Sequence, residues 1–397
     1  MSIALEQLLT PVRPSHFVGG YWGRRTLHLK GVPSRLDGLS FGFDALHDIL
    51  CGPKPPKGVS LSFTDRDGRH GAIAIDPRDY ALLDGGPTLR VSNIGAHHAP
   101  LAQLGAELKD GLLHPGQIRF DVHASTRDRG TCMHVDMPPV IVMQIEGVKR
   151  WRVAVRPSVQ WPPTAIMEGA ESIEPSDFAR RYPKIAVEPP KRAEFMEIEL
   201  HPGDALFIPA GTWHEATAVT RCLAVRATMI PLTFGALLSE QLDALFLTHP
   251  EYRGSLPLDT GDPQAVAAYL DGWLERMRMA LSALKSDDLR DRWTAHLLSE
   301  QEPGPVDPAD TLLVPRALSL KAIPRPDHVA ITAAGRSVEL PAAATAFAES
   351  LVAVPCFRAN TATDWAPGAS WDTVAPVLQA LVDAGLLRRR AHTRMAS

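Results

Sequence analysis

Cysteine is scarce in this chain, and the cysteines that it has lie far apart. They are Cys51, Cys132, Cys222 and Cys356, and no two of them form a CxxC pair. Zinc ribbons and disulfide frameworks need closely spaced or numerous cysteines, so neither is expected here. Free thiols persist in a reducing compartment, and we therefore expect a cytoplasmic protein.

Long apolar runs and an excess of charge of one sign are also missing. No run approaches the roughly 18 apolar residues that a membrane-spanning helix needs, and the opening MSIALEQLLTPVRPSHF lacks the pattern of a secretory signal. The 41 basic and 45 acidic residues give a formal charge of −4, which does not indicate a broad basic surface. We therefore expect neither membrane association nor binding to nucleic acid.

Between Gln117 and Leu232, short β-rich runs are separated by turns, a pattern typical of an antiparallel sandwich or barrel. The runs are IRFDVHAS, VIVMQI, KRWRVAV, FMEIEL, ALFIPA and CLAVRATMI. Residues 156–192 interrupt them with proline and charge, and we interpret this segment as a surface insertion that alters the rim where a substrate enters.

After Pro231 the pattern becomes helical, and a Pro-rich stretch at residues 301–310 indicates a further boundary. One helix carries an apolar stripe that could pack internally or pair with a second copy of the chain. The stripe consists of Val266, Leu270, Trp273, Leu274, Met277, Leu281 and Leu284. The tail combines helices with a hairpin, VAITAAGRSVELP, as a winged-helix module does. At 397 residues, three domains are reasonable: residues 1–235, 236–302 and 303–397.

A candidate metal site is found within the strand-rich region. His134 and Asp136 are two residues apart, so an extended strand presents both side chains on one face. A third ligand comes from GDALFIPAGTWHEA, where a turn at Pro209–Gly211 leads to His214, 78 residues after Asp136. Two histidines and one carboxylate leave three positions open on iron(II), whereas zinc sites usually use other ligand sets. We therefore expect iron.

The same segments resemble the JmjC-type cupin oxygenases of the ribosomal-protein hydroxylase (ribosomal oxygenase) family. HVDMPPVIVMQIEGVKRWRV is similar to its block of H-x-D, apolar strand and basic residues, GDALFIPAGTWHEA to its second histidine block, and FVGGYWGRRTLHLKG to its N-terminal stretch. The resemblance implies a mixed α+β chain: a double-stranded β-helix (cupin/JmjC jelly-roll), then a helical dimerisation domain, then a winged-helix domain.

The resemblance also implies roles for particular residues. His134, Asp136 and His214 would bind Fe(II), and Lys149 would pair with the distal carboxylate of 2-oxoglutarate, the cosubstrate used with O2. Ser125 is the best polar candidate near the cosubstrate, because the family's Asn and Tyr are absent from the strand IRFDVHAS.

The predicted activity is hydroxylation of an amino-acid side chain, Arg or His, in a protein or peptide, with a ribosomal protein favoured as substrate and a homodimer as the assembly. One alternative is a tailoring hydroxylase of a ribosomally made peptide or a small metabolite. Another is a non-catalytic cupin that uses its winged helix for binding. The tail has few clustered basic residues apart from Arg388–Arg390, so we interpret it as scaffolding or a docking wall.

Overall fold

The computed structural model describes residues 5–64, 70–168, 175–188, 190–254, 263–298, 304–314, 318, 320–333, 335–354 and 356–390. The chain divides into two compact units, Met1–Pro231 and Leu232–Ser397. In the described residues, no helix combines the length and apolar character that crossing a bilayer requires.

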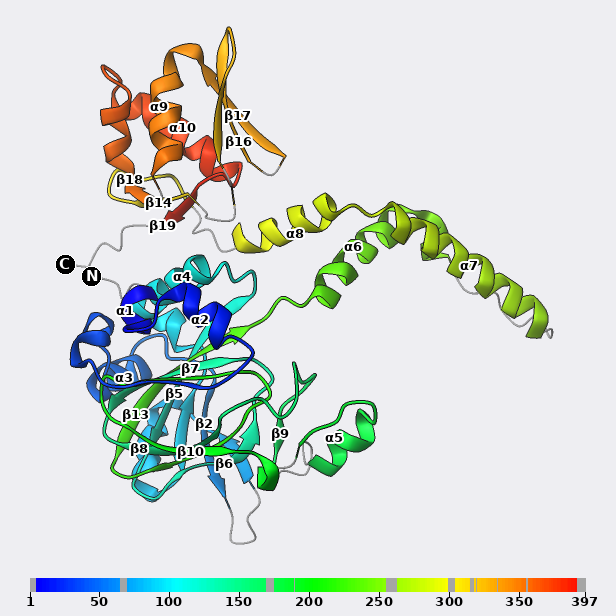
Figure 1. Ribbon diagram of the computed structural model, residues 1–397. Coiled ribbons are helices and arrows are strands. Elements are labelled where there is room, and N and C mark those ends of the chain that lie inside the picture. The colour runs from blue at the N-terminus through cyan, green and yellow to red at the C-terminus, as the bar shows by residue number, and fades with distance from the viewer. Residues whose placement is uncertain are drawn as a thin grey trace. The chain divides into compact units, whose positions relative to one another are not determined.

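The first unit is built from two antiparallel sheets (Figure 1). The larger sheet has the strand order β1 (Leu27–Leu29), β11 (Ala205–Ile208), β7 (Val140–Glu146), β13 (Cys222–Ile230), β5 (Gln117–Ser125), β4 (Thr88–Val91), β2 (Val59–Thr64) and β3 (His70–Ala74). The smaller sheet has the order β10 (Phe195–Leu200), β8 (Lys149–Ala154), β12 (Trp213–Ala218), β6 (Gly130–Val135) and β9 (Ile166–Met167). From β5 to β8 and again from β10 to β13, successive strands alternate between the sheets, which confirms the predicted double-stranded β-helix.

The outer face of the larger sheet is apolar and covered by helices. Side chains such as Leu89, Val122, Ile141 and Val225 are fully buried there, in one core with leucines of the helices. The helices are α1 (Leu5–Leu9), α2 (Pro14–Gly20), α3 (Phe43–Cys51) and α4 (Ala99–Leu112). Because side chains alternate along a strand, the next residue of each strand faces the interior between the sheets.

The interior is apolar at one end only. Val140, Val142, Val153, Leu206 and Ile208 form a small core between the two sheets. Elsewhere the inward positions of β5 and β13 carry polar or charged groups: Asp121, His123, Ser125, Cys222, Arg226 and Thr228. This polar end of the interior contains the candidate site.

The segment 156–192 is more than the surface insertion that the sequence predicted. Its strand β9 adds to the small sheet, where Met167 pairs with His134 and Ile166 with Val135. Its helix α5 (Pro175–Arg181) places Phe178 in a core on the outer face of that sheet. The segment therefore covers an apolar face that would otherwise meet water.

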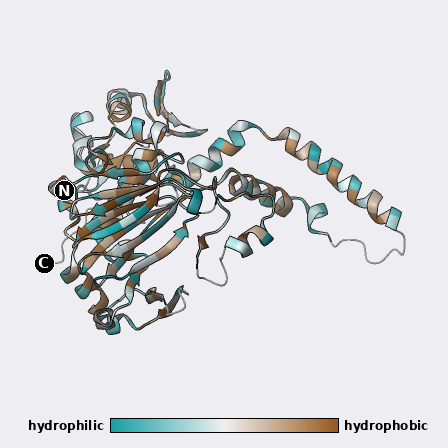
Figure 2. Ribbon diagram, turned by 60° about the horizontal axis from the view of Figure 1, so that its bottom comes forward, coloured by the Kyte–Doolittle hydropathy of each residue, from teal (hydrophilic) through white to brown (hydrophobic). Residues whose placement is uncertain are grey.

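The second unit begins with α6 (Phe234–Thr248), α7 (Pro263–Ala283) and α8 (Ser286–Leu298). None of the residues of α7 is buried, and apolar and polar residues alternate along it (Figure 2). The predicted boundary at residues 302 and 303 lies outside the described residues, and the three-domain division stays a prediction.

A separate core joins the remaining elements of the second unit. These are the sheet of β18 (Cys356–Arg358), β14 (Thr311–Leu313) and β19 (Arg388–Arg390), the sheet of β15 (Lys321–Pro324), β16 (His328–Ala333) and β17 (Arg336–Pro341), and the helices α9 (Thr345–Ala353) and α10 (Trp371–Asp383). Arg388 and Arg389 are buried, and Arg389 pairs with Asp310 at 2.6 Å. Two of the three clustered arginines are therefore used inside the fold.

Candidate metal centre and adjoining cavity

The two histidines of the predicted metal site face each other across neighbouring strands. His134 of β6 and His214 of β12 are register partners, and their ring centroids lie 4.0 Å apart. Asp136 follows directly after β6, with its carboxylate 4.0 Å from His134 Nε2 and 3.6 Å from His214 Nε2. One ligand atom from each residue lies within 4.8 Å of the other two. The structure thus brings all three predicted ligands together.

Each histidine is held in a defined orientation by a backbone carbonyl two residues earlier in the chain. His134 Nδ1 donates to Cys132 O at 2.8 Å, and His214 Nδ1 donates to Thr212 O at 2.9 Å. A ring that donates through Nδ1 offers the lone pair of Nε2, the usual arrangement of a metal-binding histidine. The donor set of two Nε2 atoms and one carboxylate therefore fits a metal ion with open coordination positions.

The protonation states also suit metal binding. Burial, followed by the charge of His214, lowers the pKa of His134 to about 3, and burial lowers the pKa of His214. For Asp136, burial acts to raise the pKa, but Arg226 and both histidines outweigh it and bring the pKa to about 2. Two neutral imidazoles and one ionised carboxylate are the forms that bind a cation.

Arg226, which the sequence reading missed, links two carboxylates at the centre. Its Nη1 lies 3.2 Å from Asp136 Oδ2, and its Nη2 lies 3.1 Å from Asp121 Oδ2. Burial acts to lower the pKa of this arginine, but Asp136 and Asp121 outweigh it and raise the pKa. An arginine at an inward position of the otherwise apolar strand CLAVRATMI was the signal that could have identified it.

The two residues predicted to contact the cosubstrate lie on the same polar interior. Lys149 is 1% exposed, its ammonium has no ion-pair partner in the described residues, and burial lowers its pKa. Ser125 is fully buried, and its hydroxyl lies 3.0 Å from Thr88 Oγ1. Cys222 lies next to both residues. It pairs with Ser125 across β13 and β5, and its thiol interacts electrostatically with Lys149. A buried cation without a counter-ion fits an anionic ligand.

A cavity joins the metal-site residues to Lys149. It is lined by His123, Thr131, His134, Val140, Val142, Lys149, Trp151, His214, Ala224 and Arg226. Trp151 thus faces the cavity, whereas Trp213 points to the other side of the small sheet and donates to Glu188 O at 2.7 Å. Arg150 and Arg152 lie on the exposed side, paired with Glu199 and Glu215.

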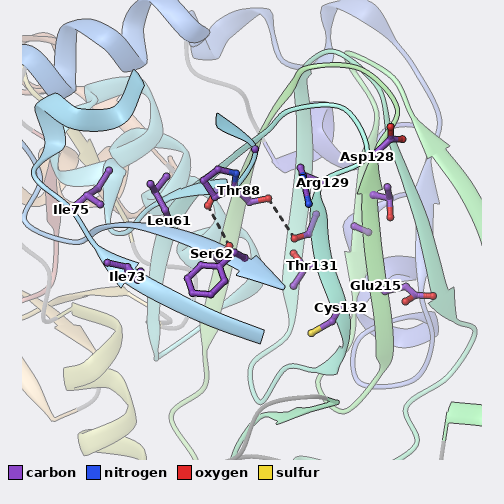
Figure 3. A pocket seen from close by; sticks show the side chains of 16 residues that line it. Leu61, Ser62, Ile73, Ile75, Thr88, Asp128, Arg129, Thr131, Cys132 and Glu215 are labelled. Carbon is purple, nitrogen blue, oxygen red and sulfur yellow. Dashed lines mark hydrogen bonds between the residues drawn. The ribbon is translucent and has the colours of Figure 1, made fainter. Parts of the chain in front are cut away.

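A larger hollow of about 690 Å³ lies beside this cavity and shares Thr131 with it. Figure 3 shows apolar side chains of β2 and β3, among them Leu61 and Ile73, opposite polar ones such as Arg129 and Glu215. A β-bulge, in which Cys132 and Met133 of β6 oppose a single residue of β12, turns both Thr131 and His134 toward the interior.

Comparison with known proteins agrees with this architecture. Residues 107–235 match the JmjC domain family. The structure of YcfD, a ribosomal oxygenase from Escherichia coli in complex with cobalt and 2-oxoglutarate, covers 96% of this chain and 99% of its own, with a TM-score of 0.53 and 18% identity. The same protein with cobalt and succinic acid gives a TM-score of 0.54.

Two curated relatives match a smaller share of the chain. The uncharacterized protein YxbC of Bacillus subtilis is 22% identical over 70% of this chain and 86% of its own length. The bifunctional lysine-specific demethylase and histidyl-hydroxylase NO66 of Drosophila persimilis is 23% identical over 53% of this chain, but the match spans only 29% of NO66. Residues 107–235 of the chain thus form a JmjC domain, and the chain has the fold of the YcfD structures.

Proposed function

We propose that the protein is an Fe(II)- and 2-oxoglutarate-dependent hydroxylase that acts on an amino-acid side chain in a protein or peptide. The observation that carries this proposal is the pairing of two features in one interior. Three metal-binding side chains converge at one point, where the two histidines line the cavity, and a buried lysine without a counter-ion lines the same cavity. A barrel that served only as a binding platform would need neither.

His134, Asp136 and His214 would hold the iron. When bound, iron with 2-oxoglutarate and O2 supplies the oxidising power: one oxygen atom enters a substrate C–H bond, and the other enters succinate as carbon dioxide leaves. Lys149 would receive the distal carboxylate of 2-oxoglutarate, and Ser125 would support the same group. The protein positions the reactants and excludes water, which the apolar side chains of the cavity suit.

A protein substrate is supported by the relatives, because YcfD is a ribosomal oxygenase and NO66 a histidyl-hydroxylase. The hollow of about 690 Å³ next to the cavity offers room for a segment of polypeptide. We infer that a ribosomal protein is the substrate and that this hollow receives the part that carries the target side chain.

We infer in addition that two copies of the chain pair through the helices of the second unit. Leu270 and Leu274 of α7 are 46% and 54% exposed, and a groove of about 530 Å³ is lined by Phe246, Tyr252, Trp273 and neighbouring apolar residues. Leu270→Asp with Leu274→Asp should convert a dimer into a monomer in light-scattering measurements, whereas a wild-type monomer would contradict the pairing.

Succinate release with Fe(II) and 2-oxoglutarate tests the main proposal. His134→Ala should abolish it together with metal binding, while Lys149→Ala should raise the KM for 2-oxoglutarate and leave metal binding intact. Arg150→Gln, on the exposed side of the same strand as Lys149, serves as the control and should leave all three quantities unchanged. If His134→Ala binds the metal as wild type does, the proposed site is wrong.

A further inference from the structure

Among the described residues, the interior of the barrel contains more cations than carboxylates. Lys149, Arg226 and Arg90 lie on the inward faces of the strands, and the carboxylates near them are Asp121 and Asp136. Both carboxylates are bound by Arg226, at 3.1 and 3.2 Å, and Asp121 also lies 3.4 Å from the half-exposed Arg119. An unpartnered charge is unfavourable away from water, so Lys149, which is buried, and Arg90, which is partly buried with a buried Nε, call for anions from outside the chain.

Arg90 is directed into the interior by the register of its strand. It stands opposite His123, which lines the cavity. Its two neighbours, Leu89 and Val91, are fully buried in the core on the outer face of the sheet. Since side chains alternate along a strand, Arg90 lies on the same face as Asp121 and Arg226.

The guanidinium of Arg90 has no partner among the described residues. Its Nε is buried and makes no hydrogen bond, and the carboxylates of Asp121 and Asp136, which are near enough to affect its charge, are both bound to Arg226. Burial lowers the pKa of Arg90 first, and the positive charge of Arg226 lowers it further. Two neighbouring nitrogens, His123 Nε2 and Arg226 Nε, also lack hydrogen bonds.

The reactants of the proposed function, on which this inference rests, do not remove the excess. The two carboxylates of 2-oxoglutarate would balance Lys149 and one charge of Fe(II), Asp136 would balance the second charge of Fe(II), and Asp121 balances Arg226. Arg90 is left over, beside the metal-binding carboxylate. A positively charged substrate side chain that enters the cavity would meet Arg226, which lines it, and would be repelled by the charge of the neighbouring Arg90 as well.

We propose that Arg90 is a specificity-determining residue that binds a carboxylate of the substrate, so that the hydroxylated residue is an aspartate or glutamate or is adjacent to one in the peptide. A planar guanidinium with free N–H groups matches a carboxylate in geometry as well as in charge. Such a contact places the neighbouring C–H bond near the metal without any further cation.

The test uses full-length protein loaded with Fe(II) and 2-oxoglutarate and a set of synthetic peptides tiled across bacterial ribosomal proteins. Each peptide is paired with a version in which Asp and Glu are replaced by Asn and Gln. Addition of one oxygen atom is followed by mass spectrometry, and anaerobic binding of the same peptides by fluorescence anisotropy. We expect the acidic member of a modified pair to be preferred at least tenfold, about 1.4 kcal/mol.

Variants at Arg90 test whether this residue causes the preference for acidic peptides. Arg90→Gln should remove most of the tenfold preference in both binding and modification, and Arg90→Lys, which keeps the charge, should retain part of it. Arg150→Gln, the same substitution at the exposed ion pair with Glu199, should keep the full preference.

Three results would overturn the inference. The first is no preference for the acidic member, including the case in which 2-oxoglutarate is consumed and no peptide is modified. The second is an equal loss of binding of acidic and neutral peptides in Arg90→Gln. The third is a change in the KM for 2-oxoglutarate alone, which would assign Arg90 to the cosubstrate. A wild-type protein that binds no metal and consumes no 2-oxoglutarate would contradict the proposed function itself.

Discussion

The same strands form both faces of the larger sheet, but one face has a structural role and the other a functional one. On the outer face, Val122, Val225 and Phe207 pack in a continuous apolar core beneath helices. On the inner face, Asp121 is also buried and His123 and Arg226 are partly buried, yet His123 Nε2 and Arg226 Nε make no hydrogen bond. The outer face provides stability, and the inner face uses some of that stability to hold groups ready for a metal and for anions.

The largest effect in the interior that this inner face lines should come from removing a metal ligand on the opposite, smaller sheet. His214→Ala should lower metal affinity by more than about 100-fold, because loss of even a supporting partner of a ligand costs about 10–100-fold. Calorimetric titration of the apo protein with Co(II) measures this. Retained affinity would show that His214 is an ordinary buried histidine, and the contrast between the faces would then be weaker.

The outer face should respond to a change that leaves the inner face intact. Phe207 is fully buried, and its ring centroid lies 4.7 Å from that of Phe17. Phe207→Ala should therefore lower the free energy of unfolding by about 3–5 kcal/mol. Chemical denaturation measures the loss. The Co(II) affinity of the folded fraction should stay within a few-fold of wild type, and a parallel loss of affinity would contradict the separation.

Arg226→Met should test the role of charge on the inner face, because it removes the cation that binds both Asp121 and Asp136. Asp121 is 2% exposed and would lose its closest cation, and breaking a buried ion pair costs about 3–5 kcal/mol. Denaturation of the apo protein would show this loss. The double variant Arg226→Met with Asp121→Leu should recover much of it, which separates loss of the ion pair from poor packing of the new side chain.

Lys149→Met should have opposite effects on the two properties. Removing a buried charge without a counter-ion should raise the stability of the apo protein, by about 1 kcal/mol or more, while the affinity for 2-oxoglutarate should fall at least about tenfold. Thermal unfolding and titration with 2-oxoglutarate under anaerobic conditions measure the two. A destabilised variant would mean that Lys149 has a stabilising partner in the fold.

The smallest effect is expected on the exposed side of the small sheet. Arg152 pairs with Glu215 at 3.1 Å, but the two side chains are 46% and 35% exposed. Such pairs contribute at most about 1 kcal/mol. Arg152→Gln should therefore change neither stability nor metal affinity by more than that, and a larger loss of either would show that the exposed side supports the centre.

The strands and the metal ligands could be predicted because their signals are local. The β-rich composition of VIVMQI and CLAVRATMI and the turns around them identified strands, and the spacings around His134 and His214 identified ligands. The partners of Arg226 could not be predicted, since Asp121 and Asp136 come from other strands and only the register brings them together. The docking of segment 156–192 was missed for a similar reason, because its proline and charge hide the few apolar residues that make the contact.

Because β9 pairs with β6, the length of segment 156–192 affects the geometry of the candidate metal centre. Met167 stands opposite His134, and Glu168 N donates to Met133 O at 3.0 Å, so the strand of the first ligand is flanked on both sides. Trimming this segment in a chimera, or replacing it with a shorter connection, would leave an open β-edge at the ligand strand. Any replacement for the segment must therefore bring its own edge strand to pair with β6.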